Sequence, residues 1–370
     1  MKHYQQRQQL QFELRCFLGV IAVLTILGVL FVYSASSVYA LESFGAANFF
    51  LKKQLISIVL GLILLLGAAQ LSLDTLKRWT PLAFLGAFSL TSLTLVPQLA
   101  TRIHGSSRWL ALGSLGVQPS EFLKWALLLY VASLLARHWY QKGSLIRTIM
   151  PISVITGLSA LVLLRQPDFG LTVTLCTTII IFLFIAQFNL KYLVGGICLA
   201  LPALAYLIFT KAYRLQRILT FLNPWRDPRG AGFQVIQSLI AIGSGGVWGV
   251  GIANSKQKFF YLPMQHTDFI FAIIAEETGF VGAVLLVALY ILLAYLGIKM
   301  ALQLQDHYAS FAVLGFTVFN TLQALINLGV ATGLLPTKGI GLPFVSYGGS
   351  ALMANGLMLG VLISCVRDQR

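Results

Sequence analysis

The sequence predicts an all-α, polytopic integral membrane protein. Its 370 residues are 58% hydrophobic and only 10% charged, with a mean hydropathy of +0.83. Soluble domains carry about 25% charged residues, so the composition excludes an ordinary soluble protein. Long apolar runs recur along the chain, as expected for helices that cross about 30 Å of hydrocarbon. A membrane β-barrel would show short alternating segments instead, so helices are the expected spanning elements.

About ten apolar segments are expected to form the transmembrane helices. The first segment ends in SASSVYA, which resembles a signal-peptidase site. Its apolar stretch is longer than a typical signal sequence, so we expect an uncleaved helix. No internal repeat and no Pro- or Ser-rich linker divides the chain, which indicates one domain over residues 1–370. The expected helices cover residues 16–36, 54–72, 80–97, 119–136, 148–165, 169–187, 191–211, 269–298, 308–333 and 351–366.

The charge distribution predicts the orientation of the bundle. An even number of spans places both termini on one side, and Lys and Arg residues gather in the short segments on that side. The positive-inside rule makes this side cytoplasmic. Residues 1–15 are then a cytoplasmic tail, and the Gln-rich start YQQRQQLQ predicts disorder there. The long loop 212–268, between the seventh and eighth helices, is expected outside the cytoplasm.

This long loop is strongly basic. Long loops are translocated largely regardless of charge, so the cations do not contradict the predicted orientation. They fit either a solvated loop or a site for an anionic ligand at the outer membrane surface. A nucleic acid is not expected, because no stacking platform or nucleic-acid fold is visible. The cations in and beside the loop are Lys211, Arg214, Arg217, Arg226, Arg229, Lys256 and Lys258, against Asp227 and Asp268.

The segment FFYLPMQHTDFIFAIIAEETGFVG, residues 259–282, holds the first candidate for chemistry. Asp268 falls where the loop becomes a helix, which fits an N-cap, since Asp oxygens accept from free backbone N–H groups. The same position at the mouth of a bundle also suits a general base. The neighbouring His266 and the basic loop are expected to favour the ionised form of the carboxyl.

Two further carboxylates, Glu276 and Glu277, lie about 12–13 Å deeper along the expected helix. They point away from Asp268, so the three cannot form one cluster. A carboxylate at that depth needs a partner or a water-filled cavity. Lys124, in the segment VQPSEFLKWALL, is the expected partner, although a local pair with Glu121 fits the spacing equally well.

Two outer turns carry further polar residues. Arg108 and Trp109, in RIHGSSRWLALGSLGVQPSE, fit either an anchor at headgroup level or a phosphate contact. Asp168, in the short turn RQPDFG, is most simply the cap of the helix that follows. It ranks below Asp268 as a catalyst, because its turn offers little room for a substrate.

A third outer segment, GLLPTKGIGLPFVSYGGSALMANG, covers residues 333–356. Its Pro and Gly residues exclude a regular helix from Pro336 to Gly349, and irregular backbone at membrane level lines a cavity or is buried in protein. Gly348 and Gly349 at a helix start fit an anion site weakly and helix packing better. Lys338 is the cation of this segment.

Five ordered motifs run from about residue 100 to residue 356. They are GSSRWLALGSLGVQPSEFLK, NPWRDPRGAGFQVIQSLIAIGSGGVWGVG, SKQKFFYLP, HTDFIFAIIAEETGFVG and NLGVATGLLPTKGIGLPFVSYGGS. With the ten-helix layout, they resemble the SEDS family (shape, elongation, division and sporulation proteins). Within that family, LPTKG and GAGFQVIQSLIAIGSGG are more similar to the division members than to the elongation members.

The resemblance implies a peptidoglycan glycosyltransferase at the outer face of the bacterial inner membrane, active in division or growth. Its substrate would be lipid II, a polyprenyl diphosphate that carries a disaccharide and a peptide. Its implied partners are a class B penicillin-binding protein, which crosslinks the strands, and other division or elongation membrane proteins.

The resemblance also transfers roles to residues. The essential Asp of the family's HTD motif matches Asp268, the implied base of an inverting transfer. Two departures stand nearby: Met264 replaces a more usual acidic residue, and Ile252 and Ala253 replace commoner glycines. The expected substrate-binding residues are Arg214, Arg217, Lys338, Glu121, Lys124, Arg108, Gln118, His266, Ser346, Gly348 and Gly349, with Glu276 and Glu277 in support.

The sequence is compatible with three functions from different classes: a polymerase, a transporter and a scaffold. A polymerase needs its polar residues at the outer surface, and most of the unusual residues lie there. A transporter that flips lipid II would need a polar route to the cytoplasmic face too, and a non-catalytic scaffold would leave Asp268 without a role. No Cys/His cluster suggests a metal site, and the need for a divalent cation, Mg²⁺ or Mn²⁺, stays open.

Overall fold

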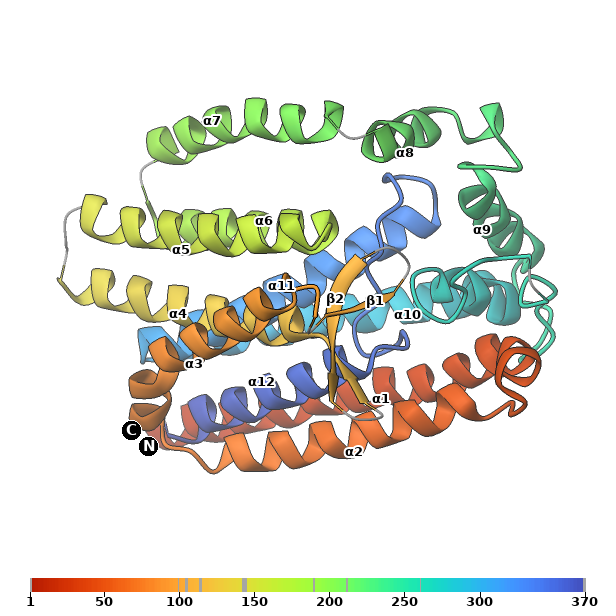
Figure 1. Cartoon of the computed structure of the whole chain (residues 1–370). Helices are drawn as coiled ribbons and strands as arrows, with labels where there is room; N and C mark the ends of the chain where they lie inside the picture. Colours follow the sequence, from red (N-terminus) through yellow and green to blue (C-terminus); the bar gives the residue numbers. More distant parts are fainter. Residues whose placement is uncertain are drawn as a thin grey trace.

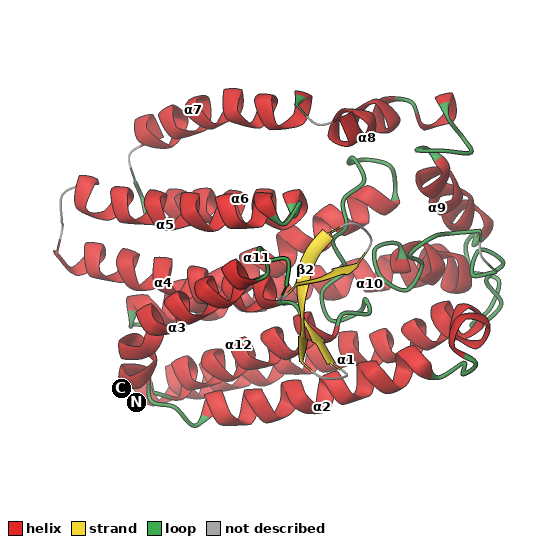
Figure 2. Cartoon of the chain, in the orientation of Figure 1, coloured by secondary structure: helices red, strands yellow, loops and turns green. Residues whose placement is uncertain are grey.

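The computed structural model describes residues 2–98, 100–103, 106–112, 115–141, 145–188, 190–210, 212–259 and 261–368. The chain is a helical bundle with one small sheet (Figures 1 and 2). The elements in order are α1 (Lys2–Phe44), α2 (Phe49–Ala69), α3 (Leu73–Leu93), β1 (Ala100–Ile103), β2 (Ser106–Leu112), β3 (Leu115–Val117), α4 (Pro119–Gln141), α5 (Leu145–Arg165), α6 (Phe169–Ile185), α7 (Leu190–Phe209), α8 (Ala212–Leu222), the 3₁₀ turn η1 (Pro224–Arg226), α9 (Phe233–Ser244), α10 (Ile270–Gln303), α11 (His307–Ala331) and α12 (Gly349–Arg367).

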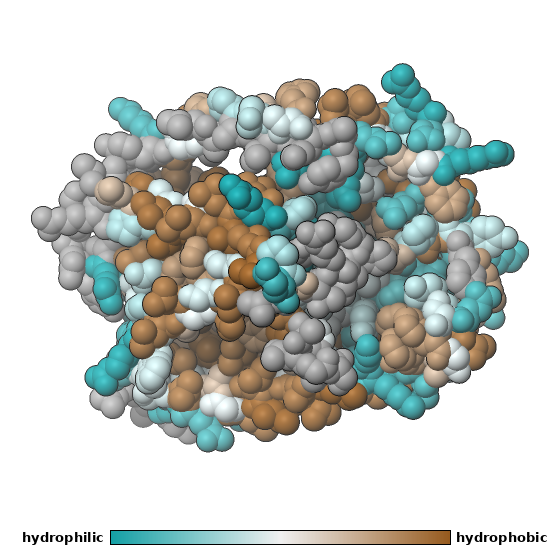
Figure 3. All heavy atoms as spheres, in the orientation of Figure 1, coloured by the Kyte–Doolittle hydropathy of each residue, from teal (hydrophilic) through white to brown (hydrophobic). Residues whose placement is uncertain are grey.

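The predicted all-α membrane fold is confirmed. Each of the ten expected ranges overlaps one of these helices, and the expected long loop lies between α7 and α10. Within the described residues, seven helices are long and apolar enough to cross a bilayer, namely α1, α2, α4, α5, α10, α11 and α12. Figure 3 shows hydrophobic residues mainly over the middle of one face, with hydrophilic residues toward the two ends of the helices. The total of ten crossings stays a prediction.

Both ends of the chain lie at the same end of the bundle (Figure 1). The predicted disorder of the first residues is wrong, because α1 already begins at Lys2. Glu13, just beyond the Gln-rich start, is 2% exposed. Its carboxylate lies 2.7 Å from Lys299 Nζ and accepts a hydrogen bond from Gln303, both near the end of α10. The Gln-rich start is therefore the exposed first part of a helix that contacts α10 at Glu13.

The small sheet was not expected from the sequence. β1, β2 and β3 form an antiparallel sheet in that order, with Thr101 opposite Trp109 and Leu110 opposite Val117. The Trp109 ring lies against Gly116 on the neighbouring strand, where a larger residue would crowd it. The sheet leads directly into α4, so it sets where Arg108 and Gln118 stand.

The long loop between α7 and α10 is also more ordered than expected. It contains α8, η1 and α9, and its segment 246–251 pairs with the backbone of α10. Gly279 interrupts α10 with a φ of +69°, and the amides of Val250 and Gly251 donate to the carbonyls of Glu276 and Glu277. Gly249 approaches so closely that a Cβ there would overlap the Glu277 carbonyl. The loop and α10 are thus joined through the backbone.

Small residues bring α12 against α2. A Cβ on Gly356 would overlap the backbone of Gly61, and one on Gly360 would overlap the backbone of Leu65. In membranes, helix association depends on such close packing, because lipid tails are as apolar as the side chains. This contact holds the start of α12 and the preceding segment 333–348 in a defined position.

Candidate active site

Asp268 lies in the turn directly before α10 and is half-buried. The N-cap interpretation of this residue is wrong, because the N-cap position is Phe269 and no side chain caps the helix. The carboxylate is therefore not occupied by the first turn of α10. It lies near Gly339, where an added Cβ would sit 3.6 Å from Asp268 Oδ2.

The backbone around Asp268 is pinned from two other elements. Asn327 on α11 donates from Nδ2 to the carbonyls of Asp268 and Ile340, at 2.8 Å each. Ser346 donates from Oγ to the Thr267 carbonyl at 2.6 Å and accepts from the Leu342 amide at 2.7 Å. Ser346, an expected substrate-binding residue, is thus engaged in positioning the HTD motif. These bonds hold the motif against the segment 333–348.

Burial raises the pKa of Asp268 to about 6, while the charges of Arg217 and then Arg108 lower it and the carboxyl of Asp168 raises it. Burial disfavours the charged form of any carboxyl, whereas nearby cations favour it. The net result is a carboxylate that is ionised above about pH 6 yet has a high affinity for a proton. These are the properties of a general base that works near neutral pH.

His266 is enclosed by aromatic rings. Its ring centroid lies 4.5 Å from that of Phe50, 5.8 Å from Tyr347 and 5.9 Å from Tyr39. This burial lowers the pKa of His266 to about 4, so the imidazole is neutral at physiological pH. The expectation that His266 contributes positive charge to Asp268 is therefore wrong, and the cations come from arginines instead.

Two predicted cations share one aromatic ring. The Arg214 guanidinium lies 5.2 Å from the centre of the Phe169 ring, and Lys338 Nζ lies 6.0 Å from it. Arg214 is only 8% exposed, and burial lowers the pKa of Lys338. Phe169 is the first residue of α6, so three separate segments meet here. We call Arg214, Lys338 and Phe169 the cation shelf; its crowded positive charge suits an anionic group.

Arg108 ties the small sheet to the turn before α6. It donates from Nε to the Gln166 carbonyl at 3.1 Å and lies 3.5 Å from the Asp168 carboxylate. Asp168 also accepts from the Leu171 amide at 3.2 Å, which confirms that it is the N-cap of α6. Burial raises the pKa of Asp168 and the Arg108 charge lowers it. The turn therefore places a cation within electrostatic reach of Asp268.

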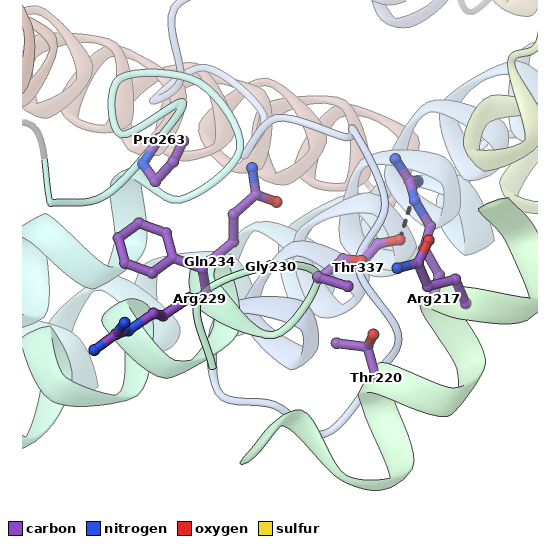
Figure 4. Close-up of a pocket in the computed structure, with 10 residues that line it drawn as sticks. Arg217, Thr220, Arg229, Gly230, Gln234, Pro263 and Thr337 are labelled. Carbon is purple, nitrogen blue, oxygen red and sulfur yellow. Dashed lines mark hydrogen bonds between the residues drawn. The ribbon is translucent and has the colours of Figure 1, made fainter. Parts of the chain in front are cut away.

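Arg217, one turn after Arg214 on α8, donates from Nη1 to the Thr337 carbonyl at 3.2 Å. It also lines a cavity of about 400 Å³ between α8, the turn before α9, Pro263 and Thr337 (Figure 4). Arg217 is thus shared between Asp268, whose pKa it lowers, and this cavity.

The expected pair between Lys124 and the deep carboxylates is wrong. Lys124 Nζ, on a side chain that is 1% exposed, lies 2.5 Å from Glu121 Oε2 in the same helix. The local pair, left open from the spacing, is the one that forms. Lys124 also lies 5.0 Å from the ring centres of Trp125 and Phe319, so aromatic rings complete its surroundings.

Glu276 and Glu277 instead hold the loop that precedes the HTD motif. Glu276 accepts hydrogen bonds from the Ser255 hydroxyl and from the Lys256 amide. Glu277 Oε1 accepts from Ser34 Oγ at 2.6 Å and lies 3.6 Å from Lys258 Nζ. Lys258, in the loop between α7 and α10, satisfies the rule that buried charge must be paired.

The segments around the start of α12 serve packing. The Gln118 amide donates to Ser350 Oγ at 2.9 Å, and Gln118 Nε2 donates to Ser120 Oγ at 3.1 Å. Gly348 occupies the N-cap position of α12, and a Cβ on Gly349 would lie 2.7 Å from Ser57 Oγ on α2. The packing interpretation of the two glycines agrees with these contacts.

The part of the chain that the structure describes contains no group of three or more His, Cys, Asp or Glu side chains able to hold a metal ion.

Residues 14–370 match the model of the FtsW/RodA/SpoVE family, described as cell cycle proteins. The chain belongs to this family. Its similarity to the SEDS proteins, expected from the motifs, is thereby confirmed.

Individual relatives cover nearly the whole chain. A probable peptidoglycan glycosyltransferase FtsW of Geobacter sp. (strain M18) is 42% identical over 342 residues, 92% of this chain and 93% of that protein. Stage V sporulation protein E of Bacillus subtilis (strain 168) is 39% identical over 348 residues, 94% of this chain and 95% of that protein.

Two solved structures share the fold. One chain, from a structure described as the structural coordination of polymerization and crosslinking by a peptidoglycan synthase complex, has a TM-score of 0.78 and 33% identity, over 95% of this chain and 97% of that chain. The rod shape determining protein RodA of Thermus thermophilus has a TM-score of 0.69 and 28% identity, over 96% of each chain.

Three residues of the site were not predicted from the sequence. Phe169 supplies the ring of the cation shelf, Asn327 pins the Asp268 backbone, and the Thr337 carbonyl receives Arg217. Phe169 directly follows the capping residue Asp168, and Asn327 is a polar residue in a mostly apolar helix. Asn327 could have been found from this signal, because polar side chains within membrane helices are costly unless they have a partner.

Proposed function

We propose that the chain is a peptidoglycan glycosyltransferase that polymerises lipid II at the outer face of the bacterial inner membrane. The observation that carries this proposal is a half-buried carboxylate, Asp268, whose pKa is raised by burial and lowered by the charges of Arg217 and Arg108. Arg108 lies on the side of the small sheet and Arg217 on the side of α8. The names of the relatives support the same activity.

The reaction joins a sugar hydroxyl of the acceptor to the anomeric carbon of the lipid-linked donor. The hydroxyl oxygen attacks that carbon as its proton passes to a carboxylate oxygen of Asp268. The bond between the anomeric carbon and the diphosphate oxygen breaks, and the lipid diphosphate leaves with the electron pair. A single displacement inverts the anomeric centre, so one base is sufficient.

The leaving diphosphate gathers negative charge as its bond to the sugar breaks. The cation shelf offers two cations for that charge, and cations already in place stabilise a transition state without reorganisation. The aromatic ring of Phe169 holds them at 5.2 and 6.0 Å. We assign the shelf to the diphosphate of the donor.

The orientation and partner belong to the same proposal. Both termini are cytoplasmic, and the end of the bundle that carries Asp268, the sheet and α8 faces outward. A class B penicillin-binding protein crosslinks the strands beside it, in line with the peptidoglycan synthase complex whose chain shares the fold. Similarity to FtsW proteins favours a role in cell division over elongation.

The rival activity, flipping of lipid II, requires a polar path through the bundle. Lys124, the buried cation that suggested such a path, is instead paired with Glu121 and surrounded by aromatic rings. The deep carboxylates are tied to the outer loop. These contacts favour the polymerase.

The test is polymerisation of purified lipid II by the detergent-solubilised protein, with its class B partner present in every reaction, read as glycan strands on a gel. Asp268→Asn should fold normally and lose activity by about 10²–10⁴-fold, the usual contribution of a general base. The exposed Glu42→Gln variant is the matched control and should keep full activity. Normal strand formation by Asp268→Asn would show that Asp268 is not the general base.

A further inference from the structure

The cavity beside Arg217 takes no part in the proposed sugar transfer. Its volume is about 400 Å³, within the range of ligand pockets in proteins. Neither Asp268 nor the cations of the shelf, Arg214 and Lys338, line it. Arg217 connects the cavity with the reacting groups, since its charge also acts on Asp268.

The walls of the cavity carry cations at its two sides and neutral polar groups between. Arg217 and Arg229 stand on opposite sides in Figure 4, with Gln234 and Thr337 between them. Gln216 adds a second side-chain amide. Several of these residues are exposed, so the cavity opens to the surface.

The turn that carries Arg229 is rigidly built. The Asp227 carboxylate accepts from the amides of Gly230 at 3.1 Å and Ala231 at 2.9 Å. A Cβ on Gly232 would overlap the Pro224 backbone, so the turn is closely packed as well. Within the described chain, no hydrogen bond or ion pair engages the Arg229 side chain, which leaves its guanidinium available to a ligand.

This arrangement differs from that of the cation shelf. A diphosphate concentrates its charge in one place and suits two cations beside one ring. Separated guanidinium groups with amides between them instead suit a longer ligand that carries spaced carboxylates and peptide bonds. Arg is the side chain that pairs with carboxylates in two parallel hydrogen bonds, and Gln offers both a donor and an acceptor to a peptide group.

We propose that this cavity binds the acidic peptide of the lipid-linked substrate, with Arg229 and Arg217 as its carboxylate contacts. The inference rests on the proposed function, since it concerns a second part of the same substrate. The peptide bound there would orient the sugar next to Asp268, because Arg217 borders both places.

The test compares two substrates in the polymerisation assay with the class B partner present. One is lipid II with its free peptide carboxylates, and the other is the same molecule with those carboxylates converted to amides. Arg229→Gln should raise the KM for the first substrate about tenfold, the effect of one lost charge-assisted hydrogen bond, and leave kcat unchanged. The KM for the amidated substrate should not respond.

Arg226→Gln is the matched control, because Arg226 is exposed in the same loop and does not line the cavity. It should leave both KM values as they are. A soluble peptide with the same carboxylates and no lipid should inhibit the wild-type protein, and inhibit Arg229→Gln about tenfold more weakly.

Two results would overturn the inference while the proposed function stands. Equal KM increases for both substrates would assign the cavity to the diphosphate, and no increase for either would remove it from the substrate site. A wild-type protein that polymerises neither substrate would overturn the proposed function itself.

Discussion

Asp268 and Glu277 lie close in sequence, yet the Glu277 carboxylate is bonded to structural partners and the Asp268 carboxylate is not. Glu277 accepts from Ser34, lies beside Lys258 and joins α1 to the loop between α7 and α10. Asp268 has its backbone held by Asn327 and its charge balanced by arginines, while its carboxylate does not cap α10. A carboxylate bonded to structural partners stabilises a fold, whereas one held in place but left open can exchange a proton.

The largest expected effect comes from removing the charge of Glu277, the carboxylate that stabilises the fold. Glu277→Gln leaves Lys258 buried without its counter-charge, and the loss of one partner of a buried pair costs about 3–5 kcal/mol. Thermal unfolding in detergent should show a clearly lower Tm. Glu42→Gln, at an exposed position on α1, should leave the Tm unchanged. An unchanged Tm for Glu277→Gln would mean that the deep carboxylate does not hold the loop.

Asn327→Ala tests how the open carboxylate is positioned. The variant leaves the carbonyls of Asp268 and Ile340 without their donor, which costs about 1–3 kcal/mol when such groups are buried. We expect a lower Tm and a lower kcat, because the turn that carries Asp268 is loosened. Asn223→Ala, an exposed loop residue whose side chain caps nothing, is the control. Wild-type kcat in Asn327→Ala would contradict a positioning role.

The pH profile tests the charge around Asp268. Its pKa of about 6 predicts that kcat/KM is full well above pH 6, is halved at about pH 6 and falls further at lower pH, because the protonated carboxyl cannot accept a proton. Arg217 lowers this pKa, so Arg217→Gln should move the acidic limb to higher pH. We also expect about a tenfold lower kcat/KM at neutral pH, from one lost charge contact. A limb that stays in place would show that Arg217 does not act on Asp268.

The smallest expected effect concerns the cation shelf. Phe169→Leu keeps an apolar side chain but removes the ring that Arg214 and Lys338 share. Cation–π contacts contribute about 1 kcal/mol, so KM for lipid II should rise about fivefold. Phe12→Leu, at a residue 66% exposed on α1, should leave KM unchanged. The same KM in both variants would mean that the ring does not order the cations.

The sequence predicted what depends on hydrophobicity along the chain. Long apolar runs located the helices, and the polar residues before α10 located Asp268. It could not predict which partners meet across the bundle: Lys124 pairs within its own helix, Glu277 pairs with Lys258, and His266 is neutral among aromatic rings. Such pairings depend on how separate elements pack, and periodicity carries no information about that.

The sheet, and the helices α8 and α9 of the loop between α7 and α10, were not predicted from the sequence for a related reason. β1 to β3 are short and lie in a segment with both apolar and polar residues, so their hydrogen-bonding partners decide their structure. The N-cap interpretation of Asp268 failed by a single residue, since α10 starts at Ile270. Helix ends are set by local contacts that a hydrophobic pattern does not resolve.

The interruption of α10 at Gly279 has an evolutionary consequence. Gly249 and Gly279 fill one another's space, and a methyl group on either would displace the other's backbone. Both residues also have a positive φ, so a second substitution would add strain and could not relieve the first. Mutational libraries of this chain should therefore recover glycine at both positions.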